Sequence, residues 1–197
     1  MSPRLVARDN REWRAGSVAM NLVGLDDATR RTMLAEFDAE EAGGRPYRSS
    51  ILSPVGLAAF ATLMRAAIAG GDEESLTEAL RDPTYWLSSD ARGRTVNVDQ
   101  RAESLAITEF NTWYVRGLAR RLLDEGEAAC EIYRAGMPRR SPSGCTCAEG
   151  EMVQVRAVYE GHRARYWPVA DPTAFSVPFG PTCHHSIRRV AHGEAGR

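Results

Sequence analysis

The sequence contains no lysine, and all 25 basic side chains of the 197-residue chain are arginine. Together with the abundance of alanine and glycine, this composition indicates a GC-rich genome rather than a functional requirement. Neither sign of charge is in excess, because the formal net charge is −1. The net charge therefore provides no general attraction to nucleic acid or to a membrane surface.

Long hydrophobic runs are also missing. The longest apolar stretch covers residues 55–68 and is interrupted by Thr62 and Arg65, so it falls short of the roughly 20 residues that a membrane-spanning helix needs. Asp9 and Glu12 stand near the start of the chain, where a secretion signal would need an apolar segment. We therefore expect a soluble protein that folds in the cytoplasm, where cysteines stay reduced, and no membrane partner.

Cysteine and histidine are absent from the first 129 residues. All the cysteines and three of the four histidines fall between residues 130 and 185, as Cys130, Cys145, Cys147, His162, Cys183, His184 and His185, and His192 follows in the tail. A tetrahedral zinc ion needs four nitrogen or sulfur ligands and can hold together a small sheet that is poor in apolar residues. The cluster therefore favours a structural zinc site, with these candidate ligands: Cys145, Cys147, Cys183 and one of the adjacent histidines, of which we name His184.

Other interpretations of this cluster stay open. Cys130 could be a small hydrophobic residue that is buried on a strand, and the remaining thiols could simply be free. A disulfide such as Cys145 to Cys183 is an alternative for a protein that leaves the cell. His162 is a further candidate for the fourth ligand.

Helix signals dominate the chain up to Gly126. We predict helices over 26–41, 54–70 and 72–81, and a longest helix from Asn97 or Asp99 to about Glu125. In the second helix the apolar residues share one face, which is typical of core packing or of a subunit interface; they are Leu57, Phe60, Met64 and Ile68. Gly117 lies inside the longest helix, where glycine costs about 1 kcal/mol, and we interpret it as a site of close packing.

After Gly126 the apolar period changes to that of strands, which we predict over 130–135, 152–158 and 175–177. The predicted fold class is α+β: a helical N-terminal half with a long central helix, followed by a small antiparallel sheet with the Cys/His cluster. We divide the chain into a helical region (1–95), a C-terminal domain (96–190) and a flexible tail (191–197).

Several short elements of the second half occur in a recognisable order. They are Arg101-Ala102 and Ala106-Ile107-Thr108-Glu109 on the long helix, Tyr133 on a strand, Cys145-Thr146-Cys147, Glu149-Gly150, and the closing run from Pro178 to Ile187. In this order they resemble the C-terminal domain of phage head-morphogenesis proteins of the Mu F-like type, the minor head proteins. The resemblance covers residues 101–190, with C-x-C where the family more often has C-x-x-C and C-H-H where it has C-R-C.

The resemblance implies a structural role in the virion of a tailed phage that infects a GC-rich bacterium. Such minor head or head–neck proteins are present at low copy near the portal vertex. The implied partners are other virion proteins (portal, major capsid or neck proteins), and the implied assembly is a homo-oligomer or ring. The resemblance implies no catalytic residues. It adds no cofactor to the structural zinc that the Cys/His cluster favours. It also implies that the chain is synthesised in the host cytoplasm before assembly.

An enzyme is the alternative from another class. Cys147-Ala148-Glu149 copies the C-A-E of zinc-dependent cytidine deaminases, whose glutamate transfers protons beside a zinc-bound water. Against it, Ser186 occupies the place of the last cysteine in P-C-x-x-C. The residues after Gly150 also predict a turn and a strand, where a deaminase has a helix.

A third hypothesis is a zinc-knuckle module that binds nucleic acid. Arg163, Arg165 and Trp167 combine positive charge with a stacking ring and could contact DNA. The simpler interpretation is a solvated turn that aromatic side chains anchor to the core. Glu109, beside the apolar stripe of the long helix, is either a surface residue or the buried partner of Arg134 or Arg163.

Overall fold

The computed structural model describes residues 20–44, 46–136, 148–162, 171, 173–179 and 183–190. The elements in chain order are α1 (Asp27–Ala42), α2 (Pro54–Gly70), α3 (Glu73–Ala79), a 3₁₀ helix η1 (Pro83–Tyr85), α4 (Val98–Asp124), β1 (Ala129–Arg134), β2 (Met152–Gln154), α5 (Val155–Glu160) and β3 (His185–Arg189). The strands form one antiparallel sheet in the order β2-β1-β3. The predicted combination of helices with a small antiparallel sheet is confirmed.

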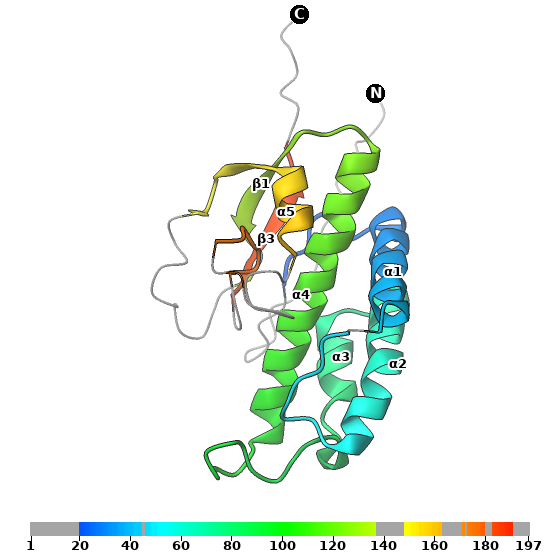
Figure 1. Ribbon diagram of the computed structural model, residues 1–197, viewed down its shortest axis with the longest axis vertical. Helices are drawn as coiled ribbons and strands as arrows, with labels where there is room; N and C mark the ends of the chain where they lie inside the picture. The colour runs from blue at the N-terminus through cyan, green and yellow to red at the C-terminus, as the bar shows by residue number, and fades with distance from the viewer. Residues whose placement is uncertain are drawn as a thin grey trace, which may run out of the picture.

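Helix α4 runs along the whole molecule and organises the rest of the fold (Figure 1). Helices α1, α2 and α3 lie on one side of it, and the sheet and α5 lie beside its C-terminal half. Its residues from Leu105 to Ala119 are therefore buried nearly all round, and they belong to one core that includes side chains of α1, α2 and α3. The division of the chain at residue 95 stays a prediction.

The helix ends follow the signals in the sequence. Four side chains cap the N-termini of α-helices by accepting a hydrogen bond from a backbone N–H of the first turn: Asp26, Ser53, Asp72 and Asn97. Each of these bonds satisfies a donor that has no partner within the helix. After α4, Gly126 adopts a φ of 82°, a left-handed conformation that glycine reaches without strain.

Gly117 allows α1 and α4 to meet backbone to backbone. The hydroxyl of Thr32 on α1 donates to the Gly117 carbonyl oxygen at 2.9 Å. A Cβ on Gly117 would lie 2.4 Å from Met33 Cγ and 2.7 Å from the Met33 backbone nitrogen. The close packing predicted for this glycine is confirmed.

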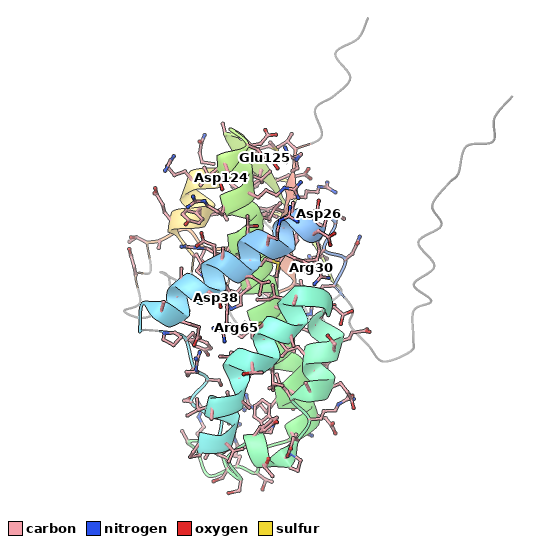
Figure 2. The ribbon with its side chains drawn as sticks, turned by 90° about the vertical axis from the view of Figure 1, so that its right-hand side faces the viewer. Asp26, Arg30, Asp38, Arg65, Asp124 and Glu125 are labelled. Carbon is pink, nitrogen blue, oxygen red and sulfur yellow. The ribbon has the colours of Figure 1, made fainter. Side chains whose placement is uncertain are left out.

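Arginine side chains join α1 to α2. Arg30 donates to the Ile68 carbonyl oxygen at 2.8 Å, which satisfies an acceptor at the C-terminal end of α2. Arg65 of α2 binds Asp38 of α1 with 2.7 Å between Nε and Oδ1. Figure 2 shows these two side chains where the helices meet.

A polar cluster joins α5 to α4 and α1. The guanidinium of Arg116 lies 4.0 Å from the centre of the Tyr159 ring and donates to Glu36 Oε2 at 2.7 Å. The Tyr159 hydroxyl donates to the second oxygen of Glu36 at 3.0 Å. The planar cation thus stacks and forms an ion pair at once, which a lysine does not reproduce.

The strand predicted over 152–158 is too long. Strand β2 ends at Gln154, and the following six residues form α5. Val155 and Val158 are both buried, and their spacing of three residues places them on one face of a helix. These valines pack on a surface that α4 and the sheet supply, and the alternation in the sequence does not reveal this change from strand to helix.

The third strand is also not where we predicted it. Residues 175–177 form no strand, and β3 (His185–Arg189) takes the place beside β1. Its first three residues are all buried and its last two are exposed, so the alternation that marks a half-buried strand is missing. In the part of the chain that the structure describes, no helix is long and apolar enough to cross a membrane.

Candidate functional site

The start of β3 is held from two sides. The backbone N–H of Ala135 donates to the His184 carbonyl oxygen at 2.8 Å, and Arg134 pairs with His185 in the sheet. On the other side, Asn111 Nδ2 of α4 donates to the His185 carbonyl oxygen at 2.8 Å. These bonds fix the backbone at the closing Cys-His-His run of the sequence.

Cys183 and His185 lie together at this point. Cys183 Sγ is 3.5 Å from His185 Nδ1, and both residues are at least 98 % buried, with exposed fractions of 2 % and 1 %. The ring of Phe179 packs edge-on against the imidazole, with 5.9 Å between centroids. The thiol and the imidazole therefore face each other in a site closed to solvent.

Glu149 approaches the same imidazole from its other nitrogen. Its Oε2 lies 4.0 Å from His185 Nε2 and accepts a hydrogen bond from Arg134 Nε at 3.1 Å. A turn places this carboxylate: Gly150 has a φ of 86°, and its N–H donates to the Ile132 carbonyl oxygen. The structure therefore gives Glu149 a turn, followed by β2, rather than the helix that the deaminase hypothesis requires.

The surroundings favour the neutral form of His185. Burial and the nearby positive charge of Arg134 lower the pKa of His185 below its usual value of 6.5, although the Glu149 carboxylate acts in the opposite direction. A neutral imidazole keeps one nitrogen lone pair, which can accept a hydrogen bond or bind a metal. The site thus combines a thiol, a neutral imidazole and a carboxylate.

The predicted zinc ligands are only partly within the described residues. Cys145 and Cys147 lie outside them, whereas Cys183 and His184 are both described and buried. It is His185, however, that contacts the Cys183 thiol. Within the described ranges, no three Cys, His, Asp or Glu side chains form a group that could hold a metal ion. The four-ligand site therefore stays a prediction.

The other candidates of this region lie in different surroundings. Cys130 is completely buried in β1, where burial raises the pKa of its thiol to about 12. The His162 ring packs on Trp113 with 5.2 Å between centroids, and its Nε2 lies 3.9 Å from Glu40 Oε2. Cys130 thus has the character of a small core residue.

The buried position considered for Glu109 is confirmed, since only 3 % of this residue is exposed on α4. Of the two arginines considered as its partner, Arg134 forms an ion pair with Glu149. Arg163 lies outside the described residues, as do Arg165 and Trp167 of the nucleic-acid hypothesis.

Sequence reasoning missed Asn111, and it named His184 where the structure places His185 beside the Cys183 thiol. Asn111 is fully buried on α4, two residues after Glu109. The helical pattern of the sequence does not distinguish this buried amide from one on the surface. A signal for His185 was present: alternate residues of an extended chain point to the same side, so His185 and not His184 shares a side with Cys183.

A second feature is the outward face of α2. Apart from Arg65, whose side chain is 43 % exposed and paired with Asp38, the exposed residues of this helix carry no charge; they are Pro54, Val55, Leu57, Ala58, Thr62, Ala66, Ala69 and Gly70. Leu57, which was predicted to lie on a stripe for core packing or a subunit interface, is 37 % exposed, and Val55 is 55 % exposed. Leu87 is 40 % exposed, and its N–H donates to the Ile51 carbonyl oxygen just before α2. Since about a quarter to a third of a protein surface is normally charged, this face is unusually apolar.

Comparisons with known protein families, with curated proteins and with solved structures gave no match to this chain. Its function is therefore inferred from the residues and their geometry.

Proposed function

We propose that this chain is a structural head or head–neck component of a tailed phage, and that it acts by binding other virion proteins. It is made in the host cytoplasm and is incorporated into the virion during head assembly or at the portal-proximal region. One observation carries the proposal: the described parts of the elements that resemble the Mu F-like domain include residues of α4, β1 and β3, and β3 contacts both α4 and β1 in one folded unit.

The contacts between these elements are direct. Asn111 stands two residues after Glu109, the last residue of the Ala106-Ile107-Thr108-Glu109 element, and its Nδ2 donates to the His185 carbonyl oxygen of the closing run. Tyr133, the aromatic residue of the strand element, pairs with Ser186. Glu109, Tyr133 and Ser186 are buried, as residues that hold a domain together usually are. Their burial supports an architectural role, because these side chains are not exposed to a substrate.

The apolar face of α2 supports protein binding. Exposed apolar surface of this kind commonly marks a site of protein–protein contact. The proposed partners are the portal, major capsid or neck proteins, or further copies of this chain in a ring. Within the proposal, the small sheet also carries the Cys/His cluster as a structural zinc module.

The test is quantitative peptide mass spectrometry of particles purified from the source phage or an induced host. We expect the chain at a constant, low ratio to the major capsid protein. Its absence from both procapsids and mature particles would overturn the proposal, and zinc content and nucleobase deamination would then be measured. In that event Glu149→Gln would abolish a deaminase activity, whereas charge reversal at Arg163 and Arg165 would abolish nucleic-acid binding.

A pair of variants tests the binding surface separately. We expect Ala58→Glu, on the exposed face of α2, to reduce incorporation into particles at least tenfold without changing the unfolding midpoint. Ala91→Glu is the matched control, because Ala91 is exposed in the loop before α4. Equal incorporation of both variants would show that α2 is not the contact.

A further inference from the structure

Glu73 is a buried carboxyl group that lies beside negative charges. It is the first residue of α3 and is only 3 % exposed. Burial raises its pKa, as do the carboxylates of its neighbours Asp72 and Glu74, and no residue that the structure describes forms an ion pair with it. A carboxylate that leaves water is costly unless a cation or several hydrogen bonds replace its hydration. The surroundings of Glu73 therefore favour a positive partner.

The group that meets this carboxyl is the backbone nitrogen of Met20. The Met20 N–H donates to Glu73 Oε1, with 2.6 Å between the nitrogen and the oxygen. Both residues are buried, since Met20 is 1 % exposed. An amide N–H is a neutral donor and leaves the charge of a carboxylate uncompensated, whereas an α-ammonium group at the same position would form a charged hydrogen bond with it.

The position of this nitrogen is fixed by contacts of Met20 and of the residue after it. The Met20 side chain belongs to the hydrophobic core. The Asn21 N–H donates to the Ala135 carbonyl oxygen at 2.6 Å, and the Tyr133 hydroxyl donates to the Asn21 carbonyl oxygen at 2.7 Å. A chain that begins at Met20 keeps all of these contacts, and they hold its terminal nitrogen against Glu73.

We propose that Glu73 binds an α-ammonium group, and that the functional chain begins at Met20. Two sources supply this group. Translation that starts at the Met20 codon leaves the amine once the formyl group is hydrolysed. Alternatively, an endopeptidase hydrolyses the preceding peptide bond, and water gives a hydroxyl group to the carbonyl carbon of residue 19 and a hydrogen to the Met20 nitrogen. The amine then binds a proton at neutral pH, because the ordinary pKa of an α-amino group is about 8.

The absence of lysine makes this proposal easy to test, because the α-amino group is the single primary amine of the chain. The denatured protein, isolated from the cells that produce it, is labelled with isotopic dimethyl groups, and peptide mass spectrometry locates the label. We expect the label on Met20. A label found only on other residues would overturn the proposal.

A stop codon in place of the codon for Asp9 distinguishes the two sources. The N-terminus at Met20 persists in this variant if translation starts there, and it is lost if a peptidase produces it. Either result assigns the source of the ammonium group that the labelling has located. Because these assays identify the N-terminus directly, they are independent of the test of the virion role.

A pair of variants tests Glu73 itself, in the chain that begins at Met20 and in the full-length chain. Glu73→Gln should lower the folding equilibrium constant of the shorter chain at least tenfold in urea unfolding, because it removes the counter-ion of a buried ammonium. In the full-length chain we expect no loss, since glutamine still accepts from the amide N–H. The matched control Glu74→Gln, at an exposed neighbour, should change neither chain. Equal effects of Glu73→Gln in both chains would overturn the role of Glu73.

Amine reactivity covers the case in which Glu73→Gln fails to fold. The shorter chain contains every residue that the structure describes. In its wild-type form, the amine should react with an acetylating reagent at least tenfold more slowly in the native state than in denaturant, because Met20 and Glu73 are both buried. Equal rates in the two states would show that the α-ammonium group is not bound.

Discussion

Replacing Gly117 by alanine should destabilise the protein, although alanine is the better helix former. In an open helix the change from glycine to alanine stabilises by about 1 kcal/mol. Here the added methyl group would lie 2.4 Å from Met33 Cγ, 2.7 Å from Met33 N and 2.9 Å from Met33 Cα. A flexible side chain can move away, but two of these three atoms are backbone atoms of α1. Relief therefore requires that α1 moves away from α4.

The magnitude follows from two costs and one gain. Overpacking of a tight contact costs about 1–3 kcal/mol. Displacement of α1 also lengthens the bond from Thr32 Oγ1 to the Gly117 carbonyl oxygen, now 2.9 Å, which contributes about 1 kcal/mol. After subtraction of the gain in helix propensity, we expect the free energy of unfolding to fall by about 2 kcal/mol.

Equilibrium unfolding in urea, followed by tryptophan fluorescence and by far-UV circular dichroism, measures this difference. Trp113, one turn before Gly117, is buried in the same core and reports on it. Gly70→Ala is the matched control, because Gly70 is in α2 and a Cβ there would meet nothing within 4 Å. We expect it to be neutral or to stabilise by up to about 1 kcal/mol. If Gly117→Ala stabilises as much as Gly70→Ala, the close contact between α1 and α4 is refuted.

Three further predictions concern buried or paired groups. The hydrogen bond from Arg121 holds the pKa of Asp26 at about 2, below the ordinary 3.8, so the stability it contributes is complete above pH 3.8 and is lost as the pH falls toward 2. Asp26→Ala should cost about 1 kcal/mol at pH 7 through the lost helix cap and should flatten this acid limb in unfolding curves; an unchanged limb contradicts the pairing. Burial raises the pKa of Glu73 above 4.5, so wild-type stability should fall as the pH rises from 4.5 through the folded-state pKa. Glu73→Gln keeps an acceptor for the Met20 N–H, which binds Glu73 Oε1 at 2.6 Å, and should remove that fall; equal slopes in thermal melts at pH 4.5 to 7.5 would argue against it. Because burial raises the Cys130 pKa to about 12, iodoacetamide should label this thiol only in denaturant, and labelling of the native protein, detected by peptide mass spectrometry, would show that β1 opens.

The sequence alone determined where the first four α-helices begin and approximately where they end. Asp26, Ser53, Asp72 and Asn97 cap the four α-helices that the sequence analysis predicted, because a cap is a local interaction that a few neighbouring residues specify. It also indicated the close approach at Gly117, since a glycine inside a helix needs a packing reason. The concentration of cysteine and histidine in the last third pointed to the region of the candidate site.

Only the tertiary structure decided the sheet and the pairing within the site. Strand β3 forms because Cys130 to Arg134 of β1 pair with residues more than 50 positions later in the chain, and its first residues are buried, so no local alternation marks it. Helix α5 forms because its two valines need a surface that α4 and the sheet provide. The contact between His185 and Cys183 is also a result of the tertiary structure. The orientation of His185 depends on Asn111, Arg134 and Glu149, which the fold brings from other elements.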